Sequence, residues 1–375
     1  MSLAIIDARQ WQNIFDLRTG VKVDVENAET LLVKGVLARH PYPGDVENAS
    51  NAWVSDTALD LIEQYQPQLA CLCYAHQYFV SRYTPLSETQ RRGMIADVFQ
   101  EVQRFLDASG YTPLIIGTGD MDRVVGEIDL SRLDGLSIAS HWSARYAGLH
   151  RPSSADLAYV RGSQNIERVV SRLEWISLFP GVEHDPERIP EYLLIAREGW
   201  TFRTTGMPLR KTVMIPATSL NIPVSTPLGA PGTITAIRGL IEANLSDERI
   251  ALIILEGIGG RDFALPHQTC NNHAGWFSYE PGEAQYLTIM TGTHQVFAYP
   301  AGYRYHDEND ANPEYPFSGY LKTIPQHTLG RDFRDKSIAV GNRSMLTHMV
   351  FGARISIECF ARNLYNQGCM GVIHD

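Results

Sequence analysis

The chain has 375 residues, 44% of them hydrophobic and 20% charged, which is enough to bury a large core in one α/β domain with insertions or in two packed domains. Lys and Arg total 32 against 42 Asp and Glu, and the net charge of -10 opposes nonspecific binding to nucleic acid or to an anionic membrane. No run of about 18 apolar residues occurs that would span a bilayer. These properties predict a soluble protein with a small-molecule ligand and with neither a nucleic-acid nor a membrane partner.

The cysteines are few, odd in number and widely spaced, unlike those of a secreted disulfide scaffold: Cys71, Cys73, Cys270, Cys359 and Cys369. This usage predicts a reducing, cytoplasmic environment. Cys71 and Cys73 share a face of an apolar run, and we expect them to be buried thiols.

Apolar runs and helical periodicity alternate from the N-terminal part of the chain onward. Residues 31–33 predict an early strand, and Ser55 predicts the N-cap of a helix that ends before Pro67. The dense apolar run of residues 69–74 then predicts a strand that is covered on both faces.

The clearest predicted element is an amphipathic helix over residues 87–106. Ser87 and Gln90 fit a capping box, and Gly110 supplies a stop. The apolar run at residues 114–116 follows and predicts another buried strand. Strand, helix and strand form a parallel crossover unit.

The same alternation returns in the second half of the chain. Residues 212–215 predict a strand, residues 234–245 an amphipathic helix, and residues 250–255 a further buried strand. The expected fold class is therefore α/β, layered, with a mainly parallel sheet, helices on both faces and long loop insertions. Residues 199–231 and 266–325 are expected to form long loops or a small subdomain.

The domain boundary is expected near residue 209. It would separate an α/β first half, residues 1–209, from a loop-rich second half, residues 210–375, and one continuous domain is the alternative. A homo-oligomer is also left open, because aromatic residues gather between Trp276 and Tyr320.

Ligands of open α/β sheets bind beyond the carboxyl ends of the strands, so polar residues directly after strands are the first site candidates. His76 follows the run at 69–74, and Asp120 and Asp122 follow the run at 114–116. Glu256 follows the run at 250–255, with Arg261 and Asp262 a few residues later. If these strands are parallel, the candidates meet on one rim of the sheet.

The candidate residues on this rim suit acid/base or metal chemistry. Asp120 and Asp122 are expected to ligate a hard cation or to supply a base, with an ordinary capped turn as the alternative. Glu256 directly follows six apolar residues, where desolvation raises the pKa of a carboxyl group, and a structural ion pair is the alternative. Arg261 is its candidate partner, and His76 is a candidate acid or base.

A second group of candidates lies further along the chain. His267, Cys270 and His273 have donors close enough in sequence to share a divalent metal, and imidazole with thiolate suits zinc, although an ordinary loop fits equally well. Thr291 and His294 are further ligand-binding candidates. The sequence does not fix a cofactor, and a divalent metal is the candidate.

Several common nucleotide-binding and catalytic motifs are absent from the sequence. Residues 257–259 have the first two glycines of a dinucleotide-binding fingerprint but not the third, and Pro266 disfavours the long helix that should follow. There is no Walker loop, no Gly-x-Ser-x-Gly elbow and no His-Glu-x-x-His.

Five segments together resemble a known family. Residues 77–85, the helix after them and residues 115–121 are similar to an Asp-x-x-Gly-His element, a long helix and a Ser-Asp-His-Gly-Met element. Residues 253–259 resemble a strand with Asp-Gly at its end, and residues 288–292 resemble a Thr-Gly that follows a nucleophile. In this respect the chain resembles the phosphodiesterase and nucleotide pyrophosphatase branch of the alkaline phosphatase superfamily, with the segments in permuted order. The resemblance implies a phosphoesterase-like hydrolase.

The chain departs from that family at the metal ligands. Gln77 and Ser81 stand where the family has a metal-binding Asp and His, and Gly119 and Asp120 stand for its Asp-His pair. Glu256 replaces the first Asp, and Gly282 occupies the nucleophile position.

The leading functional hypothesis is a hydrolase-like enzyme that acts on a small metabolite, phosphorylated or sugar-like, at the rim. The alternative is a non-catalytic ligand-binding or assembly protein that kept the scaffold. Both interpretations require the strands at 69–74, 114–116 and 250–255 to be parallel neighbours, with the last of them central in the sheet.

Overall fold

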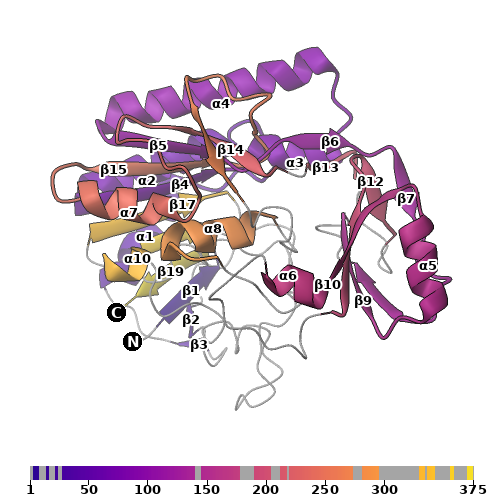
Figure 1. Ribbon diagram of the computed structural model, residues 1–375. Coiled ribbons are helices and arrows are strands. Elements are labelled where there is room, and N and C mark those ends of the chain that lie inside the picture. The colour runs from indigo at the N-terminus through magenta and orange to yellow at the C-terminus, as the bar shows by residue number, and fades with distance from the viewer. Residues whose placement is uncertain are drawn as a thin grey trace.

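A computed structural model describes residues 3–7, 14–16, 22–23, 28–139, 145–177, 190–203, 212–217, 219–272, 281–294, 329–333, 336–342, 355–358 and 370–374 (Figure 1). The largest sheet has 11 strands in the order β16-β14-β5-β15-β4-β17-β18-β19-β1-β2-β3. Its middle strands run parallel: β5 (Thr112–Gly117), β15 (Ile250–Leu255), β4 (Leu69–Tyr74), β17 (Ser337–Gly341) and β18 (Ile355–Glu358). The predicted α/β fold class is confirmed.

Antiparallel strands extend this parallel core on both sides. Beyond β5 lie β14 (Asn221–Ser225) and β16 (Gln268–Asn271). Beyond β18 lie β19 (Met370–His374), β1 (Leu3–Asp7), β2 (Ile14–Asp16) and β3 (Lys22–Val23).

Helices cover both faces of the sheet, as expected. One face packs on α1 (Ala28–Arg39), α2 (Ser50–Tyr65) and α4 (Glu88–Ser109). The other packs on α3 (His76–Tyr83), α7 (Ala236–Asn244), α8 (Pro281–Thr291) and α10 (Leu329–Asp332). Along β4, Leu72 joins the first core cluster, whereas Cys71 and Cys73 join the second. Every residue of this strand is apolar because both of its faces are buried. Within the described ranges, no helix is both long and apolar enough to cross a membrane.

The capping box predicted for the longest helix is present. The Ser87 hydroxyl accepts a hydrogen bond from the Gln90 backbone N–H at 3.3 Å, and the Gln90 side chain accepts one from the Ser87 N–H at 2.9 Å. Gly110 ends α4 with a φ of 67°, in the left-handed region that glycine adopts without strain.

One expected element near the N-terminus and the expected start of another are wrong. Residues 31–33 lie inside helix α1 rather than in a strand, because so short an apolar run fits either structure and the neighbouring helix-forming residues decide. Ser55 lies inside α2, which begins five residues earlier, at Ser50. Its hydroxyl is buried within hydrogen-bond distance, 2.9 Å, of the Tyr74 hydroxyl instead of capping the helix.

A smaller antiparallel sheet forms a separate layer that the sequence analysis did not anticipate (Figure 1). Its order is β10 (Ile166–Ser171), β11 (Tyr192–Ala196), β9 (Tyr146–His150) and β8 (Leu136–Ala139). Helix α5 (Ser154–Gly162) packs on this sheet, and together they form a hydrophobic core cluster separate from those of the main sheet. Helix α6 (Arg172–Ser177) contacts β10 and β11.

Two short strand pairs connect the smaller sheet to the main sheet. Strand β6 (Met121–Arg123) pairs antiparallel with β13 (Met214–Pro216), and β7 (Gly126–Ile128) pairs parallel with β12 (Trp200–Phe202). The strand predicted at 212–215 is thus β13, displaced by up to two residues and outside the main sheet. The boundary predicted near residue 209 lies outside the described residues and stays a prediction.

The stretches predicted to be loops contain regular elements. Residues 199–231 hold β12, β13 and β14, and residues 266–325 hold β16 and α8, with most of the remainder of the latter stretch outside the described residues. Strand β14 was not predicted, because Pro223 lies inside it. Proline is tolerated there beside the short strand β16, near the edge of the sheet.

Candidate functional site

The carboxyl ends of β4, β15 and β5 lie at one level of the sheet. Leu255, the last residue of β15, is in register with Tyr74 on one side and with Gly117 on the other. The loops that follow these strands therefore open on a common rim, as the sequence predicted. The topological requirement of the family resemblance, a central β15 between β4 and β5, is also met.

The loops after β5 and β15 are joined by short backbone contacts. The Gly257 N–H donates to the Thr118 hydroxyl at 3.0 Å, and the Gly119 N–H donates to the Ile258 carbonyl at 3.2 Å. Gly259 packs so closely on the other loop that a Cβ atom there would lie 2.3 Å from the backbone nitrogen of Asp120. Only glycine fits this crossing, so the loops form one rigid surface.

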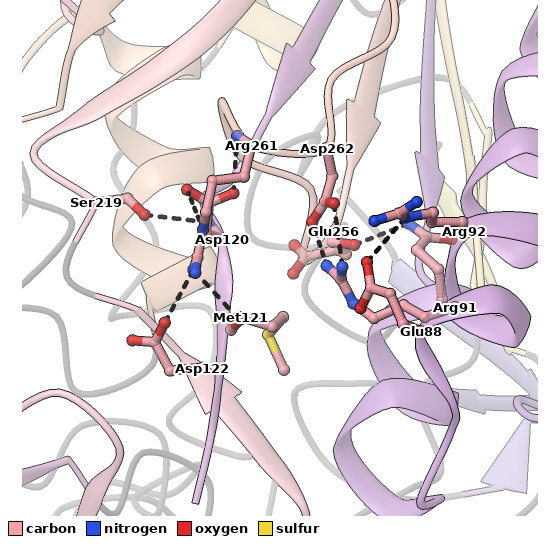
Figure 2. A network of polar contacts seen from close by, with 11 residues as sticks. Glu88, Arg91, Arg92, Asp120, Met121, Asp122, Ser219, Glu256, Arg261 and Asp262 are labelled. Carbon is pink, nitrogen blue, oxygen red and sulfur yellow. Dashed lines mark hydrogen bonds and ion pairs between the residues drawn. The ribbon is translucent and has the colours of Figure 1, made fainter.

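Arg261 and the two aspartates form the centre of the site (Figure 2). The Arg261 guanidinium lies 2.8 Å from one Asp122 carboxylate oxygen and 3.3 Å from Asp120. The Asp120 carboxylate also accepts a hydrogen bond from the Arg261 backbone N–H at 3.2 Å. The structure thus brings together Asp120, Asp122 and Arg261, three residues that the sequence predicted as site candidates. The two aspartates lie about 140 positions before the arginine in the sequence.

Arg145 reaches the same aspartate from the smaller sheet. It is 3% exposed and lies 3.4 Å from Asp122, which is 5% exposed, and 3.3 Å from Glu167. Two guanidinium groups thus flank the buried Asp122 carboxylate, and a buried charge needs such partners. The sequence analysis missed Arg145 because it lies in a different layer, and nothing local marks it.

A second carboxyl group, that of Glu198, interacts with the Asp122 carboxylate. It lies in the turn between β11 and β12 and is exposed. Its side chain is hydrogen-bonded to Asp122, and the charge of Asp122 raises the pKa of Glu198, an effect that Arg145 and Arg261 partly offset.

A further ion pair fixes the start of α4 to the loop after β15. Arg91 contacts Asp262 through both guanidinium nitrogens, one of them 3.0 Å from Asp262 Oδ1. Both side chains are largely buried, at 13% and 15% exposure. Such a two-point contact fixes orientation as well as distance. Asp262, predicted as ligand-binding, therefore positions α4 against the rim.

These residues surround a cavity of about 730 Å³, here called the rim cavity. The volume is within the range of sites for small molecules. It lies where the main sheet, the start of α4 and the turn before β12 meet. Its walls carry four arginines, four acidic residues and a few small or apolar residues: Glu88, Arg91, Arg92, Met121, Asp122, Arg123, Val125, Glu198, Gly199, Met214, Arg261 and Asp262.

His76 and Glu256, two of the predicted catalytic residues, do not line the rim cavity. His76 is 6% exposed at the start of α3, with its ring Nδ1 3.4 Å from the Asp45 carbonyl, and burial lowers its pKa. Glu256 is 2% exposed; its backbone N–H donates to the Tyr74 carbonyl at 3.0 Å, and its carbonyl accepts from Gln77 at 2.8 Å. Glu256 remains a candidate next to the cavity rather than on its wall.

The end of the sheet beside His76 is filled by a buried amide network. Asn342 donates to Ser50 at 2.8 Å and to Asn51 at 2.9 Å, and it accepts from the Ala75 N–H at 2.7 Å. Asn51 in turn donates to Gln77 at 3.1 Å. Fully hydrogen-bonded buried amides stabilise a fold and leave little capacity for a ligand.

His267 and Cys270, two members of the second group of candidates, do not line the rim cavity. Cys270 is buried in β16, and burial raises the pKa of its thiol to about 12. His267 is exposed, and its ring packs against Phe263 with the ring centroids 5.1 Å apart. His273 lies outside the described residues, so the three-residue metal set stays a prediction.

Thr291 and His294 lie at and beyond the C-terminal end of α8. The Thr291 hydroxyl donates to the Leu287 carbonyl at 2.6 Å, which is the usual satisfaction of a threonine within a helix. Neither residue lines the rim cavity. Helix α8 meets the rim nearer its beginning, where the buried Gln285 donates to the Thr118 carbonyl at 2.8 Å.

The positions that correspond to the family's metal ligands do not fit a pair of metal ions. Both N–H groups of the Gln77 amide donate to backbone carbonyls, at 2.7 Å and 2.8 Å. Gly119 has no side chain, and Asp120 is paired with Arg261. Among the described residues, no group of three or more His, Cys, Asp or Glu side chains is placed to hold a metal ion.

Comparison with known proteins gives little further information. No protein family and no curated protein matches the chain. Two solved structures of a phosphonoacetate hydrolase from Sinorhizobium meliloti 1021, one with phosphonoacetate and one with phosphonoformate, are similar at 15% identity and a TM-score of 0.36. The similarity covers 54% of this chain and 55% of the other, so the chain spans about half the length of that protein. A likeness of this degree does not establish kinship.

Proposed function

We propose that this chain is a hydrolase-like enzyme that acts on a small anionic metabolite, phosphorylated or sugar-like, held in the rim cavity. The observation that carries the proposal is the position of this cavity at the carboxyl ends of β5 and β15, with an acidic pair and four arginines on its walls. Ligands of α/β sheets bind at such strand ends.

The charges around the cavity favour an anion. Arg91 is neutralised by Asp262, and Arg261 by the two aspartates. Among the residues that the structure describes, Arg92 forms an ion pair with Glu88 alone, on an exposed turn of α4, and such a contact is easily exchanged for a ligand. Arg123 has no ion pair within the described residues; its guanidinium lies 3.4 Å from the Leu86 carbonyl. Arg92 and Arg123 are therefore the groups available to a phosphate or carboxylate.

The acidic pair supplies the chemistry in this proposal. Asp122 lies between Arg145 and Arg261, and its charge raises the pKa of the Glu198 carboxyl group above the usual value. A carboxyl group with a raised pKa suits proton transfer to and from a reacting substrate. The superfamily resemblance supports hydrolysis, but no step is assigned to a metal, because the corresponding ligand positions do not fit one.

A non-catalytic ligand-binding protein is the second candidate. It is favoured by the amide network around Gln77, which fills the part of the rim where the resemblance would place a metal ligand. On this alternative the arginines bind the same class of ligand without turnover.

The test uses Arg123→Gln, with Arg132→Gln as the matched control. Arg132 lies over the ring of Tyr159 on helix α5 and does not line the cavity, and the two variants change the net charge equally. Turnover is measured with p-nitrophenyl phosphate, bis(p-nitrophenyl) phosphate and p-nitrophenyl glycosides, with and without added Mg²⁺, Mn²⁺ or Zn²⁺, alongside calorimetric binding of inorganic phosphate.

We expect hydrolysis of a compound in the panel and a loss of at least about tenfold in phosphate affinity, roughly 1.4 kcal/mol, in Arg123→Gln only. Phosphate binding without any turnover would contradict the hydrolase and favour the non-catalytic ligand-binding protein. If both variants changed the phosphate affinity equally, the rim cavity would not be the binding site for either proposed function.

A further inference from the structure

We propose that two buried amides, Gln285 and Asn272, position the rim residue Asp120. Asp120 in turn contacts Arg261, which lines the rim cavity. Neither amide lines that cavity, so both are positioning residues rather than ligand-binding ones. The inference rests on the proposed binding of an anion in the rim cavity, and it adds the residues that fix the geometry of one wall.

Gln285 holds the loop after β5 from helix α8. Its side chain is 2% exposed, and its amide nitrogen donates to the Thr118 carbonyl at 2.8 Å. Thr118 lies two residues before Asp120, and its own N–H donates to the Leu255 carbonyl at 3.1 Å. The backbone that leads to Asp120 is thus held between the end of β15 and α8.

Asn272 holds the segment to which Asp120 is bound. It is fully buried directly after β16, and its amide nitrogen donates to the Ser219 carbonyl at 3.2 Å. The Ser219 hydroxyl accepts a hydrogen bond from the Asp120 N–H at 3.1 Å (Figure 2). The packing is close, since a Cβ atom at Gly119 would lie 2.4 Å from that hydroxyl oxygen. A shift of Ser219 therefore moves Asp120.

The oxygen atoms of the same two amides do not stabilise the fold. Gln285 Oε1 and Asn272 Oδ1 are buried, and no described residue donates a hydrogen bond to either of them. Each amide is fixed in orientation, because its nitrogen faces a backbone carbonyl oxygen, which only accepts hydrogen bonds. A buried acceptor without a donor costs free energy of folding. Side chains that lower stability in this way are typical of functional positions.

The link from the amides to the cavity passes through one ion pair. The Asp120 carboxylate lies 3.3 Å from the Arg261 guanidinium and accepts a hydrogen bond from the Arg261 backbone N–H at 3.2 Å. The Arg261 side chain is 56% exposed, so its position depends strongly on such contacts. Gln285 and Asn272 therefore influence where a cation of the cavity wall lies, although neither touches a ligand.

Gln285→Met and Asn272→Leu test the positioning role, with Asn244→Leu as the matched control. Asn244 also donates to a backbone carbonyl, that of Leu240 at 2.8 Å, but it lies at the end of α7 that precedes β15, opposite the rim. In the two rim variants we expect the melting temperature to be unchanged or raised, because the variant also removes an unpartnered buried oxygen. A lower melting temperature in either variant would show that its amide stabilises the fold, and would remove that residue from the proposal.

Hydrogen exchange reports on the loop without any ligand. The Gly119 and Asp120 N–H groups donate to Ile258 and Ser219. In both rim variants we expect these two N–H groups to exchange at least about tenfold faster than in the wild-type protein, while those in the middle of β15 keep their rates. Unchanged exchange at Gly119 and Asp120 would overturn the positioning role.

Calorimetric binding of inorganic phosphate completes the test. We expect the affinity to fall by about fivefold or more in the two rim variants and to be unchanged in Asn244→Leu, as for residues that act on a site without touching its ligand. Equal affinities in all variants would overturn the link from the amides to the cavity. If the wild-type protein binds no phosphate, the proposed function fails, and the exchange rates still decide whether the amides position Asp120.

Discussion

Asp122 shows how a single side chain takes its properties from distant parts of the chain. The carboxylate itself is marked in the sequence by its place after an apolar strand. Its two cationic partners and its acidic partner come from three other segments, Arg145, Glu198 and Arg261. Buried charges are stable only with such partners, so a strand-end aspartate identifies a place for chemistry without revealing which chemistry.

Glu256 allows a prediction at the same scale. Glu256→Gln keeps the shape of the side chain and both backbone hydrogen bonds of the residue while removing its charge. We expect the melting temperature to be unchanged or raised, and binding of inorganic phosphate to be unchanged or strengthened, because a negative charge next to the cavity is removed. A loss of several kcal/mol in the free energy of unfolding would show instead that Glu256 is half of a buried structural pair.

At the scale of elements, the crossing of two loops controls the geometry of the site. Strands β5 and β15 are neighbours, and the loops that leave them touch where Gly259 passes over the backbone of Asp120. The contact fixes the distance between the aspartates and Arg261, because neither loop can move without the other.

Gly259→Ala tests this crossing, with Gly260→Ala as its control. A Cβ atom at position 259 would lie 2.3 Å from the Asp120 nitrogen, whereas one at position 260 meets no atom within 4 Å. We expect Gly259→Ala to lower the free energy of unfolding by about 1–3 kcal/mol, as overpacking does, and to weaken phosphate binding. Gly260→Ala should change neither quantity in denaturant unfolding or calorimetry. Equal behaviour of the two variants would mean that the loops are not in contact in solution.

The sequence predicted those elements whose local pattern admits a single interpretation. The strands at 69–74, 114–116 and 250–255 are continuous apolar runs because helices cover both faces, and α4 carries its start and stop signals in Ser87 and Gly110. The early strand at 31–33 failed because three apolar residues also fit a helix. Strand β14 was missed because its proline contradicts the usual strand pattern.

At the scale of the whole molecule, the site depends on two layers. The rim of the main sheet supplies Asp122 and Arg261, and the smaller sheet and its connection supply Arg145 and Glu198. The sequence analysis therefore identified one side of the cavity. The other side depends on how the smaller sheet packs, and long-range packing leaves no periodic signal in the residues that it brings together.

The most direct test is to locate the site at which the protein binds a phosphate analogue. Crystals soaked in tungstate, a heavy oxyanion, locate the anion through its anomalous scattering. The account predicts the strongest peak in the rim cavity, within contact distance of Arg92 or Arg123, and the loss of that peak in Arg123→Gln crystals but not in Arg132→Gln crystals. A strongest peak elsewhere on the molecule, with none in the rim cavity, would contradict the central claim that this cavity binds an anionic substrate.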